Sequence, residues 1–402
     1  MTGRPEGTGP IVGIVGGGQL ARMLAEAATP LGIHVRVLAA PGDEGAREVA
    51  PDVVVGSPDD AEALASFAAG VDVLTFDHEN VDHDALRRIE ADGTPVRPGV
   101  RTLEYSDKAH QRRAFAAAGL PVPPFVVVDP RPDSSDGTDT DALEVALAFA
   151  AEHGDPAEGR RVVAKASRGG YDGRGVWMLR SDELEGFLSD YDGAPLVLEP
   201  LLPLDREVAV LVARRPSGEV ATWPVVETVQ VDGMSDEVLL PAPLDDELRR
   251  RAAAVGHAVA EVVDAVGVIA IELFVSGGEL LVNEIAPRVH NSGHLTIEAC
   301  ATSQFEQHLR AILDWPLGPT DALAPAAVMA NVVGGAEGDP RGRQAAALAR
   351  VPGAHVHLYG KTSRPGRKLG HVTVTGAELA TCRSRAGVAA DVLSGVEGST
   401  DA

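Results

Sequence analysis

The segment Val268-Ile-Ala-Ile-Glu-Leu-Phe-Val-Ser-Gly-Gly-Glu-Leu-Leu-Val-Asn-Glu-Ile-Ala-Pro-Arg-Val-His-Asn-Ser-Gly-His294 is the most informative part of this chain. Its two apolar runs flank Ser276-Gly277-Gly278, a pattern that predicts a β-hairpin. Each run carries one carboxylate where a buried strand is usually apolar, Glu272 in the first run and Glu284 in the second. Burying a charge inside a strand costs free energy unless a cation or hydrogen bonds compensate it.

The length of the turn decides whether the two glutamates face the same side. Side chains alternate along a strand, so a three-residue loop gives an even pairing register and places Glu272 and Glu284 on one face. A two-residue loop places them on opposite faces. Paired carboxylates with Asn283 beside them suit Mg²⁺, a hard ion that takes oxygen ligands and shares them with phosphates. The alternative is a surface hairpin with two solvated glutamates.

Composition limits the classes of function that fit this chain. A length of 402 residues allows two or three domains, and 45% hydrophobic with 23% charged residues is typical of a globular protein. The net charge of -24 argues against a general nucleic-acid or anionic-membrane binder, although a local basic cluster can still hold a small phosphorylated ligand. The two cysteines lack metal-ligand spacing, which predicts a reduced compartment and no zinc site. Without a signal core or a ~20-residue apolar span, we expect a soluble cytoplasmic protein.

The first third of the chain alternates strand and helix patterns. The helical pattern covers residues 19–31, and the predicted strands cover residues 11–15, 34–38, 53–55 and 71–76. Such alternation predicts a parallel sheet with helical crossovers. Residues 161–274 mix strands and helices as α+β folds do, and the Pro/Gly-rich connection at residues 315–319 leads to a smaller C-terminal unit.

Gly16-Gly17-Gly18 lies between a predicted strand and a predicted helix. Backbone amides without obstructing side chains, next to a helix N-terminus, suit an anion. The spacing does not match Gly-x-Gly-x-x-Gly, so a dinucleotide site is a weak interpretation, with Asp43 as its only candidate ribose ligand. A tight strand-to-helix turn with no ligand is the alternative.

The run Arg168-Gly-Gly-Tyr-Asp-Gly-Arg-Gly175 follows a predicted strand that ends at Lys165. A glycine loop can close over phosphates with its amides while the lysine neutralises their charge. A simple turn is the alternative, and the neighbouring lysine favours function.

Three further polar segments are candidates for ligand contacts. Leu196–Leu202 runs from a strand into a proline-interrupted linker, whose backbone suits an adenine edge, with Glu207 for ribose hydroxyls; a structural linker is the alternative. Arg288, His290, Asn291 and His294 directly follow the glutamate hairpin and suit a small oxyanion, unless the histidines are structural. Lys361-Thr-Ser-Arg-Pro-Gly-Arg-Lys368 holds four cations in eight residues and suits a phosphate monoester, unless it is simply solvated.

Together these segments resemble the ATP-grasp superfamily and, within it, the 5-(carboxyamino)imidazole ribonucleotide synthases. The resemblance covers roughly residues 10–390 and rests on residues 16–20, 169–175, 283–294, 303–310 and 364–371. It implies an α/β and α+β protein with an ATP-grasp fold. A Rossmann-like pre-ATP-grasp domain with a parallel sheet would occupy residues 1–112, and an ATP-grasp domain residues 113–320, with a lid at about 124–205. A small β-rich domain would occupy residues 321–402, with a frayed tail.

The resemblance also implies a site for ATP and Mg²⁺, or Mn²⁺, between two subdomains. Glu272 and Glu284 would bind the metal. The expected ATP contacts are Lys108, Lys165, Gly170, Tyr171, Asp172, Gly173, Arg174, Gly175, Val176, Glu199, Pro200, Leu201, Leu202, Glu207, Gln230, Asn283 and Glu284. Gln230 stands where relatives often carry His, and Lys108 where many carry Arg.

The implied reaction is ATP-driven carboxylation of 5-aminoimidazole ribonucleotide by bicarbonate, through carboxyphosphate, in purine biosynthesis. The expected catalytic residues, which hold bicarbonate and close over it, are Arg288, His290, Asn291, Asp172 and Arg174. The expected substrate contacts are Gly17, Gly18, Gln19, Leu20, Glu79, Lys361, Arg364, Arg367 and Lys368, although the role of Glu79 is less defined. A homodimer is expected from the family.

Two other functions compete with this one. A related ATP-grasp ligase, such as a formate-dependent transformylase or a biotin-type carboxylase, lacks the Arg-Val-His-Asn-Ser-Gly-His run of residues 288–294. A dinucleotide-binding oxidoreductase or regulatory protein predicts NAD(P) binding and no ATP hydrolysis.

Overall fold

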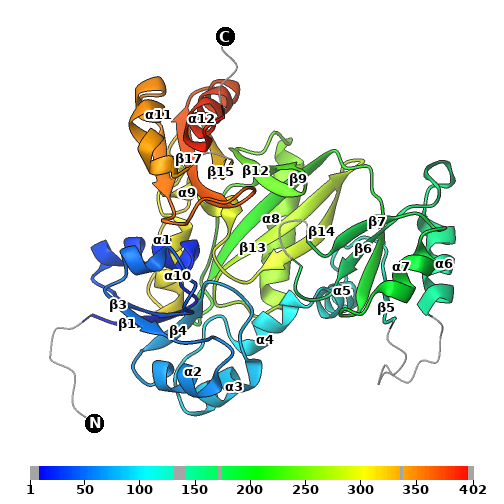
Figure 1. Ribbon diagram of the computed structural model, residues 1–402, viewed down its shortest axis with the longest axis horizontal. Coiled ribbons are helices and arrows are strands. Elements are labelled where there is room, and N and C mark those ends of the chain that lie inside the picture. The colour runs from blue at the N-terminus through cyan, green and yellow to red at the C-terminus, as the bar shows by residue number, and fades with distance from the viewer. Residues whose placement is uncertain (1–8, 131–141, 171–173, 336–337, 397–402) are drawn as a thin grey trace.

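The structure is a computed structural model that describes residues 9–130, 142–170, 174–335 and 338–396 (Figure 1). Within these ranges, no helix is both long enough and apolar enough to cross a membrane.

The N-terminal region forms a four-stranded parallel sheet of order β3-β2-β1-β4. Its apolar strands are buried between helices, as the strand-helix alternation predicts. The elements are β1 (Ile11–Val15), α1 (Gln19–Ala28), β2 (His34–Ala39), β3 (Asp52–Val55), α2 (Ala61–Ala68), β4 (Val73–Phe76), α3 (His83–Ala91), α4 (Val100–Leu103) and α5 (Lys108–Ala117). The predicted parallel sheet is therefore confirmed.

A nine-stranded sheet runs through the middle of the molecule (Figure 1), in the order β14-β13-β9-β11-β12-β15-β17-β16 with β10 beside β9. Its strands are β9 (Arg206–Arg214), β10 (Val220–Thr222), β11 (Val226–Val231), β12 (Met234–Leu240), β13 (Gly267–Ser276), β14 (Glu279–Ala286), β15 (Ala326–Val333), β16 (His355–Leu358) and β17 (Lys368–Gly376). The C-terminal strands therefore extend this sheet through the pairing of β12 with β15. Helices α11 (Gln344–Arg350) and α12 (Leu379–Ser394) lie beside them.

Two cores lie on the two faces of this sheet. On one face, odd-numbered residues of β13 pack against α8 (Asp246–Val262) and α5. On the other, Val268 and Ala270 pack with α10 (Gln304–Ile312) and α1. The short helix α9 (Thr296–Ala299) precedes α10. Beyond Ala270 the even-numbered face is only half-buried, so it is open to a ligand where Glu272 lies.

A separate four-stranded antiparallel sheet forms the lid subdomain on the right of Figure 1. It has the order β5-β8-β6-β7, with β5 (Val126–Val128), β6 (Val162–Ala166), β7 (Val176–Leu179) and β8 (Leu196–Pro200). Helices α6 (Ala142–His153) and α7 (Leu184–Asp190) cover the face that carries Val162 and Ala164. The opposite face, with Lys165 and Glu199, is turned toward the central sheet.

Candidate active site

Strands β13 and β14 form the predicted hairpin, but its turn is shorter than expected. Ser276 pairs with Glu279, so only Gly277 and Gly278 form the loop. Both glycines have positive φ, which a tight two-residue hairpin turn requires. The three-residue loop predicted from the sequence is wrong, and a regular register would have placed the two glutamates on opposite faces.

A β-bulge in β14 restores the pairing of the glutamates. Leu273 pairs with Val282, and the next pair is Glu272 with Glu284, so Asn283 is the extra residue. A bulge places two residues opposite one and re-aims side chains locally. Glu272 and Glu284 therefore lie directly across from each other, as predicted, but for a different reason.

Glu207 adds a third carboxylate to the same face. It lies in β9 and pairs with Phe274, two residues beyond Glu272 in β13. Because paired residues and every second residue share a face, Glu207 and Glu272 face the same side. Gln230 in β11 hydrogen-bonds to the Glu207 carboxylate. Glu207, the residue predicted for the ribose, is therefore beside the glutamate pair, and Gln230 contacts it.

The electrostatics of this face favour a cation. Burial, followed by the Glu284 and Glu207 charges, raises the pKa of Glu272 to about 8. Burial also opposes ionisation of Glu284, but Lys108, which donates a hydrogen bond to it, lowers the pKa of Glu284 below its usual value. No three His, Cys, Asp or Glu side chains in the described ranges form a complete metal cage. A cation here would therefore need further ligands, and phosphate oxygens are the usual ones for Mg²⁺.

A buried ion-pair cluster links the lid subdomain to the central sheet. The Lys165 Nζ atom lies 2.7 Å from Glu199 Oε2, donates to Asn283 Oδ1 at 2.9 Å, and sits 5.4 Å from the centre of the Phe274 ring. Burial lowers the pKa of Lys165. Glu199 is only 2% exposed, and its carboxylate is fully engaged in this cluster. Glu199 can therefore contact adenine only through its backbone.

Arg112 completes the cluster, and the sequence analysis missed it. Its Nε atom donates to Glu199 Oε1 at 2.5 Å. Its two terminal nitrogens donate to the carbonyls of Val282 at 2.8 Å and Asn283 at 2.7 Å, so Arg112 holds the bulge. The available signal was its spacing three residues before Phe115, which places a charge on the buried face of helix α5.

The glycine-rich lid loop connects β6 to β7. Of its predicted ATP contacts, Tyr171, Asp172 and Gly173 lie outside the described residues. Gly170 and Arg174 flank them, and Gly175 has φ of +74° while its carbonyl accepts a hydrogen bond from Ala166 at 2.8 Å. Val176 pairs with Lys165 across the sheet, so the predicted lid residues that are described lie beside the lysine.

The linker after β8 supplies the remaining predicted ATP contacts. Pro200 ends the strand, Leu201 is exposed, and Leu202 is half-buried. In the edge strand β7, Met178 is 65% exposed and lies opposite Val163. An exposed methionine on a strand facing the central sheet offers an apolar surface for a planar base, and no sequence pattern pointed to it.

The polar run after β14 lies directly beyond the glutamates. His290 Nε2 is 3.6 Å from Glu272 Oε1, and its Nδ1 lies 2.9 Å from Ser292 Oγ. Arg288 forms an ion pair with Glu79 at 2.9 Å, which brings Glu79 from the N-terminal domain into the site. Asn291 exchanges amide hydrogen bonds with Asn331 at 3.0 and 3.1 Å. His290 therefore adjoins Glu272 of the glutamate pair, whereas Arg288 contacts Glu79 and the Asn291 amide is bound to Asn331.

Two side chains fix this run: Gln304, which the sequence analysis did not single out, and His294, for which it left a structural role open. Gln304 in α10 accepts from His290 N at 2.9 Å and donates to His290 O at 2.7 Å. It also hydrogen-bonds to His294 Nδ1 at 3.0 Å. His294 is fully buried, and burial lowers its pKa well below the usual value, so it fits the structural alternative.

The glycine loop Gly16–Gly18 does not offer free amides to an anion. Gly17 N donates to Asp43 Oδ2 at 2.9 Å, and Gly18 N donates to Asp77 Oδ2 at 2.6 Å. Leu20 N donates to the other oxygen of Asp77 at 3.0 Å, and the Leu20 side chain is buried in the core. The predicted amide cradle is therefore wrong, because carboxylates of the protein already occupy these donors.

Gln19 contacts the basic loop 361–368, although the two lie at opposite ends of the chain. Lys361 Nζ donates to Gln19 Oε1 at 2.5 Å. Arg367 Nη1 donates to Glu44 Oε2 at 2.8 Å. Arg364 is exposed, and Lys368 is half-buried at the start of β17. Polar side chains from the two ends of the chain therefore come together here.

Comparison with known proteins identifies this arrangement. Residues 10–107 match the ribonucleotide synthetase preATP-grasp domain, residues 113–305 the ATP-grasp domain, and residues 327–385 the phosphoribosylaminoimidazole carboxylase C-terminal domain. The chain is 46% identical to the N5-carboxyaminoimidazole ribonucleotide synthase of Mycobacterium tuberculosis over 394 residues, 96% of this chain and 88% of that protein. The chain belongs to the N5-carboxyaminoimidazole ribonucleotide synthase family.

Solved structures of this family share the whole fold. The carboxyaminoimidazole ribonucleotide synthase of Aspergillus clavatus in complex with ATP has a TM-score of 0.85 at 32% identity, covering 97% of this chain and 100% of that one. The complex of the same enzyme with ADP and 5-aminoimidazole ribonucleotide has a TM-score of 0.84 at 32% identity, covering 96% and 99%. The ATP-grasp fold with a parallel-sheet domain before it is thus confirmed for this family member.

Proposed function

We propose that this family member carboxylates 5-aminoimidazole ribonucleotide with bicarbonate, using ATP, to form N5-carboxyaminoimidazole ribonucleotide, ADP and phosphate. The observation that carries this proposal is the position of Arg288 and His290. They directly follow the end of the strand that carries Glu284, and His290 lies 3.6 Å from Glu272, so a phosphoryl-transfer face and an oxyanion site adjoin. The polar side chains of Gln19 and Lys361, which contact each other, would bind a third reactant.

The triphosphate of ATP would lie between the lid sheet and the glutamate face. Lys108 and Lys165 are the cations at this place: Lys108 donates to Glu284, a carboxylate that a bound cation would share, and Lys165 pairs with Glu199. Met178 and Phe274 offer apolar surface to the base, while Glu207 and Gln230 face the ribose. The described lid residues Gly170 and Gly175 allow the loop to approach phosphates closely.

Glu272 and Glu284 would hold Mg²⁺, with Asn283 beside them. The residues fit such an ion, because they place two carboxylates opposite each other, and burial together with the Glu284 and Glu207 charges raises the pKa of Glu272 to about 8. When bound, Mg²⁺ neutralises the charge on phosphate oxygens during phosphoryl transfer.

Arg288 would hold bicarbonate against the γ-phosphate through its guanidinium, which Glu79 orients. A bicarbonate oxygen then attacks the γ-phosphorus, the bond to the ADP oxygen breaks, and carboxyphosphate forms. Its C–O bond breaks to release carbon dioxide and phosphate. The exocyclic amine of the substrate forms the new N–C bond and loses a proton. Asp172 and Arg174 would close over this step and exclude water, which otherwise hydrolyses the intermediate.

Phosphate release with ATP, bicarbonate and 5-aminoimidazole ribonucleotide tests the proposal. We expect release to depend on all three, with one carboxylated product formed per ADP. Turnover only with formate or biotin would assign the chain to another ligase chemistry. NAD(P) binding without ATP hydrolysis would exclude both the proposed carboxylation and any other ATP-dependent ligase activity.

The remaining proposals concern the organisation of the protein. We propose domain limits at residues 112 and 320, which the matched ranges 10–107, 113–305 and 327–385 support. We also propose a homodimer, which light scattering on the purified protein tests. The cytoplasmic location remains a prediction.

A further inference from the structure

Residues 43–48, here the bridging loop, lie between the two halves of the predicted ribonucleotide pocket. Asp43 anchors one end by accepting hydrogen bonds from Gly17 N at 2.9 Å and Ala40 N at 2.8 Å. Ala46 N donates to Gly17 O at 3.2 Å. The bridging loop is therefore fixed to the glycine loop that leads directly into Gln19.

Glu44 reaches from the bridging loop to the basic loop 361–368. Its carboxylate accepts from Thr362 N at 2.9 Å, from Thr362 Oγ1 at 2.6 Å, and from Arg367 Nη1 at 2.8 Å. The hydrogen bonds from Thr362, helped by Arg367, lower the pKa of Glu44 to about 2. Glu44 thus remains ionised and binds the residue that follows Lys361.

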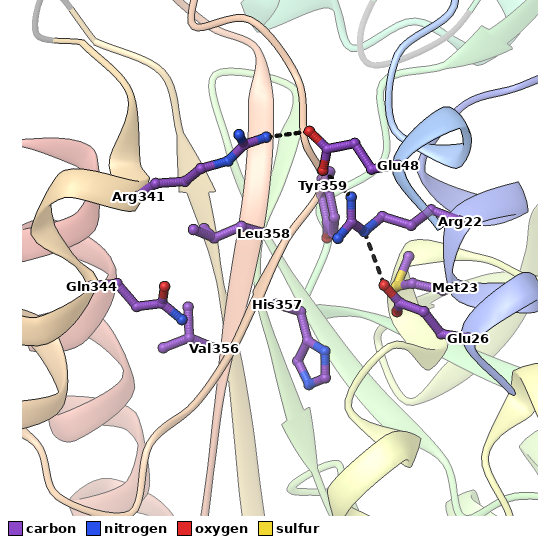
Figure 2. A pocket seen from close by; sticks show the side chains of 10 residues that line it. All are labelled: Arg22, Met23, Glu26, Glu48, Arg341, Gln344, Val356, His357, Leu358 and Tyr359. Carbon is purple, nitrogen blue, oxygen red and sulfur yellow. Dashed lines mark hydrogen bonds and ion pairs between the residues drawn. The ribbon is translucent and has the colours of Figure 1, made fainter. Parts of the chain in front are cut away.

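Gly45 and Glu48 make two further contacts from the same loop. Gly45 has φ of +110°, and a Cβ there would lie 2.8 Å from the Tyr359 carbonyl oxygen, so only glycine fits. Glu48 lies 2.7 Å from both Arg22 in α1 and Arg341 of the C-terminal domain. Glu48, Arg22 and Arg341 line, with Tyr359, a cavity of about 300 Å³ (Figure 2).

Together these contacts hold the segment that carries Lys361 in place. The segment 359–362 passes over the bridging loop, and Lys361 within it meets Gln19. The distance between the two walls of the pocket is therefore set by residues 43–48 and not by the substrate-facing side chains alone.

We propose that Glu44 is a positioning residue for the ribonucleotide, which acts by holding Thr362 and Arg367 so that the basic loop faces Gln19. This inference rests on the proposed function. It assigns to Glu44 no contact with ATP or with the reacting atoms.

Steady-state kinetics of Glu44→Ala and Glu44→Gln test the role. We expect Glu44→Ala to raise KM for 5-aminoimidazole ribonucleotide about tenfold, with kcat within about twofold and KM for ATP unchanged. The variant loses the charge-assisted hydrogen bonds that hold the basic loop, and this loop is proposed to bind the ribonucleotide but not ATP. Glu44→Gln keeps one acceptor and is expected to raise KM about threefold. Glu219→Ala, which removes an ion pair of 2.8 Å with Arg215 far from the pocket, is the matched control.

Hydrogen exchange separates this inference from the proposed function. The Thr362 amide donates to Glu44, so its exchange in Glu44→Ala is expected to be faster than in the parent, even in an enzyme without turnover. Unchanged exchange, or an equal loss of kcat and of ATP affinity, overturns the positioning role. A lower KM for the ribonucleotide also overturns it, because Glu44 would then compete with the phosphate for Arg367. Faster exchange in a protein that never turns over this substrate overturns only the proposed function.

Discussion

The nucleotide face of the central sheet and the ribonucleotide pocket hold their charges in different ways. On the nucleotide face, Arg112 and Glu199 are 2–3% exposed, and strand register and a bulge fix their neighbours. In the ribonucleotide pocket, Glu44 and Arg367 are 28–29% exposed and lie on loops from opposite ends of the chain. Buried ion pairs are costly to break, whereas exposed ones contribute little to stability. Substitutions should therefore disable catalysis or folding at the first region and substrate affinity at the second.

The largest effect is expected at the glutamate pair. Glu284→Gln keeps the shape of the side chain but removes the charge opposite Glu272, so kcat should fall about 100- to 1000-fold while the protein stays folded. Turnover at saturating Mg²⁺ measures kcat, and circular dichroism shows whether the protein is folded. Glu279→Gln, on the same strand but paired with Arg251 at the surface, is the control. Near-normal turnover of Glu284→Gln would exclude the metal-binding role.

Arg112→Met tests how strongly the buried cluster supports that face. It leaves the carboxylate of Glu199 paired only with Lys165 and frees the carbonyls at the bulge. The free energy of unfolding should fall by about 3–5 kcal/mol, because breaking a buried pair leaves an uncompensated charge. Urea unfolding measures it. Arg113→Met, at the exposed neighbouring position, should change it by less than about 0.5 kcal/mol, and equal losses would refute the cluster's role.

As the pH falls, the stability contributed by His308 beside the sheets should be lost before that contributed by Glu44 in the ribonucleotide pocket. His308 contacts Thr75 Oγ1 at 2.8 Å and accepts from Val268 N at 3.0 Å, and burial lowers its pKa to about 4. Its neutral form contributes stability above pH 6.5, and that stability is lost as pH falls toward 4, on the order of 3 kcal/mol at the lower limit. Glu44, with a pKa of about 2, keeps its contribution above pH 4.5 and loses it only below.

Unfolding measured from pH 7 to 4 checks this order. His308→Gln should make the dependence of stability on pH shallower by about one proton. The same change at exposed His34 should leave the slope as it is. An unchanged slope in His308→Gln would show that other groups cause the acid sensitivity.

The smallest effect is expected at Gln230, which touches the nucleotide face only through Glu207. Gln230→His should change KM for ATP by about threefold or less, with kcat unchanged, since an exchanged polar partner on one side chain is worth about 1 kcal/mol. Steady-state kinetics with varied ATP decide it. A change of kcat would place Gln230 closer to the reacting atoms than the structure does.

Much of the site was readable from residue types and their order. Glu272 and Glu284 in apolar runs, Lys165 before a glycine loop, and four cations in residues 361–368 each conflict with their local surroundings. Such conflicts indicate function, because a fold does not keep them without a compensating ligand. Arg112 gave only the weaker signal of a charge three residues before Phe115, and Gln304 gave none, since their partners are mainly backbone groups distant in sequence.

The sequence by itself determined the parallel sheet, the hairpin and the chemical types of the site residues, because periodicity and residue chemistry are local properties. Only the tertiary structure decided that a bulge held by Arg112, and not the length of the turn, faces Glu284 toward Glu272. It also decided that Asp43 and Asp77 occupy the amides of the glycine loop, and that Glu44 joins the two ends of the chain. Each depends on hydrogen bonds between distant segments, whose geometry no local pattern contains.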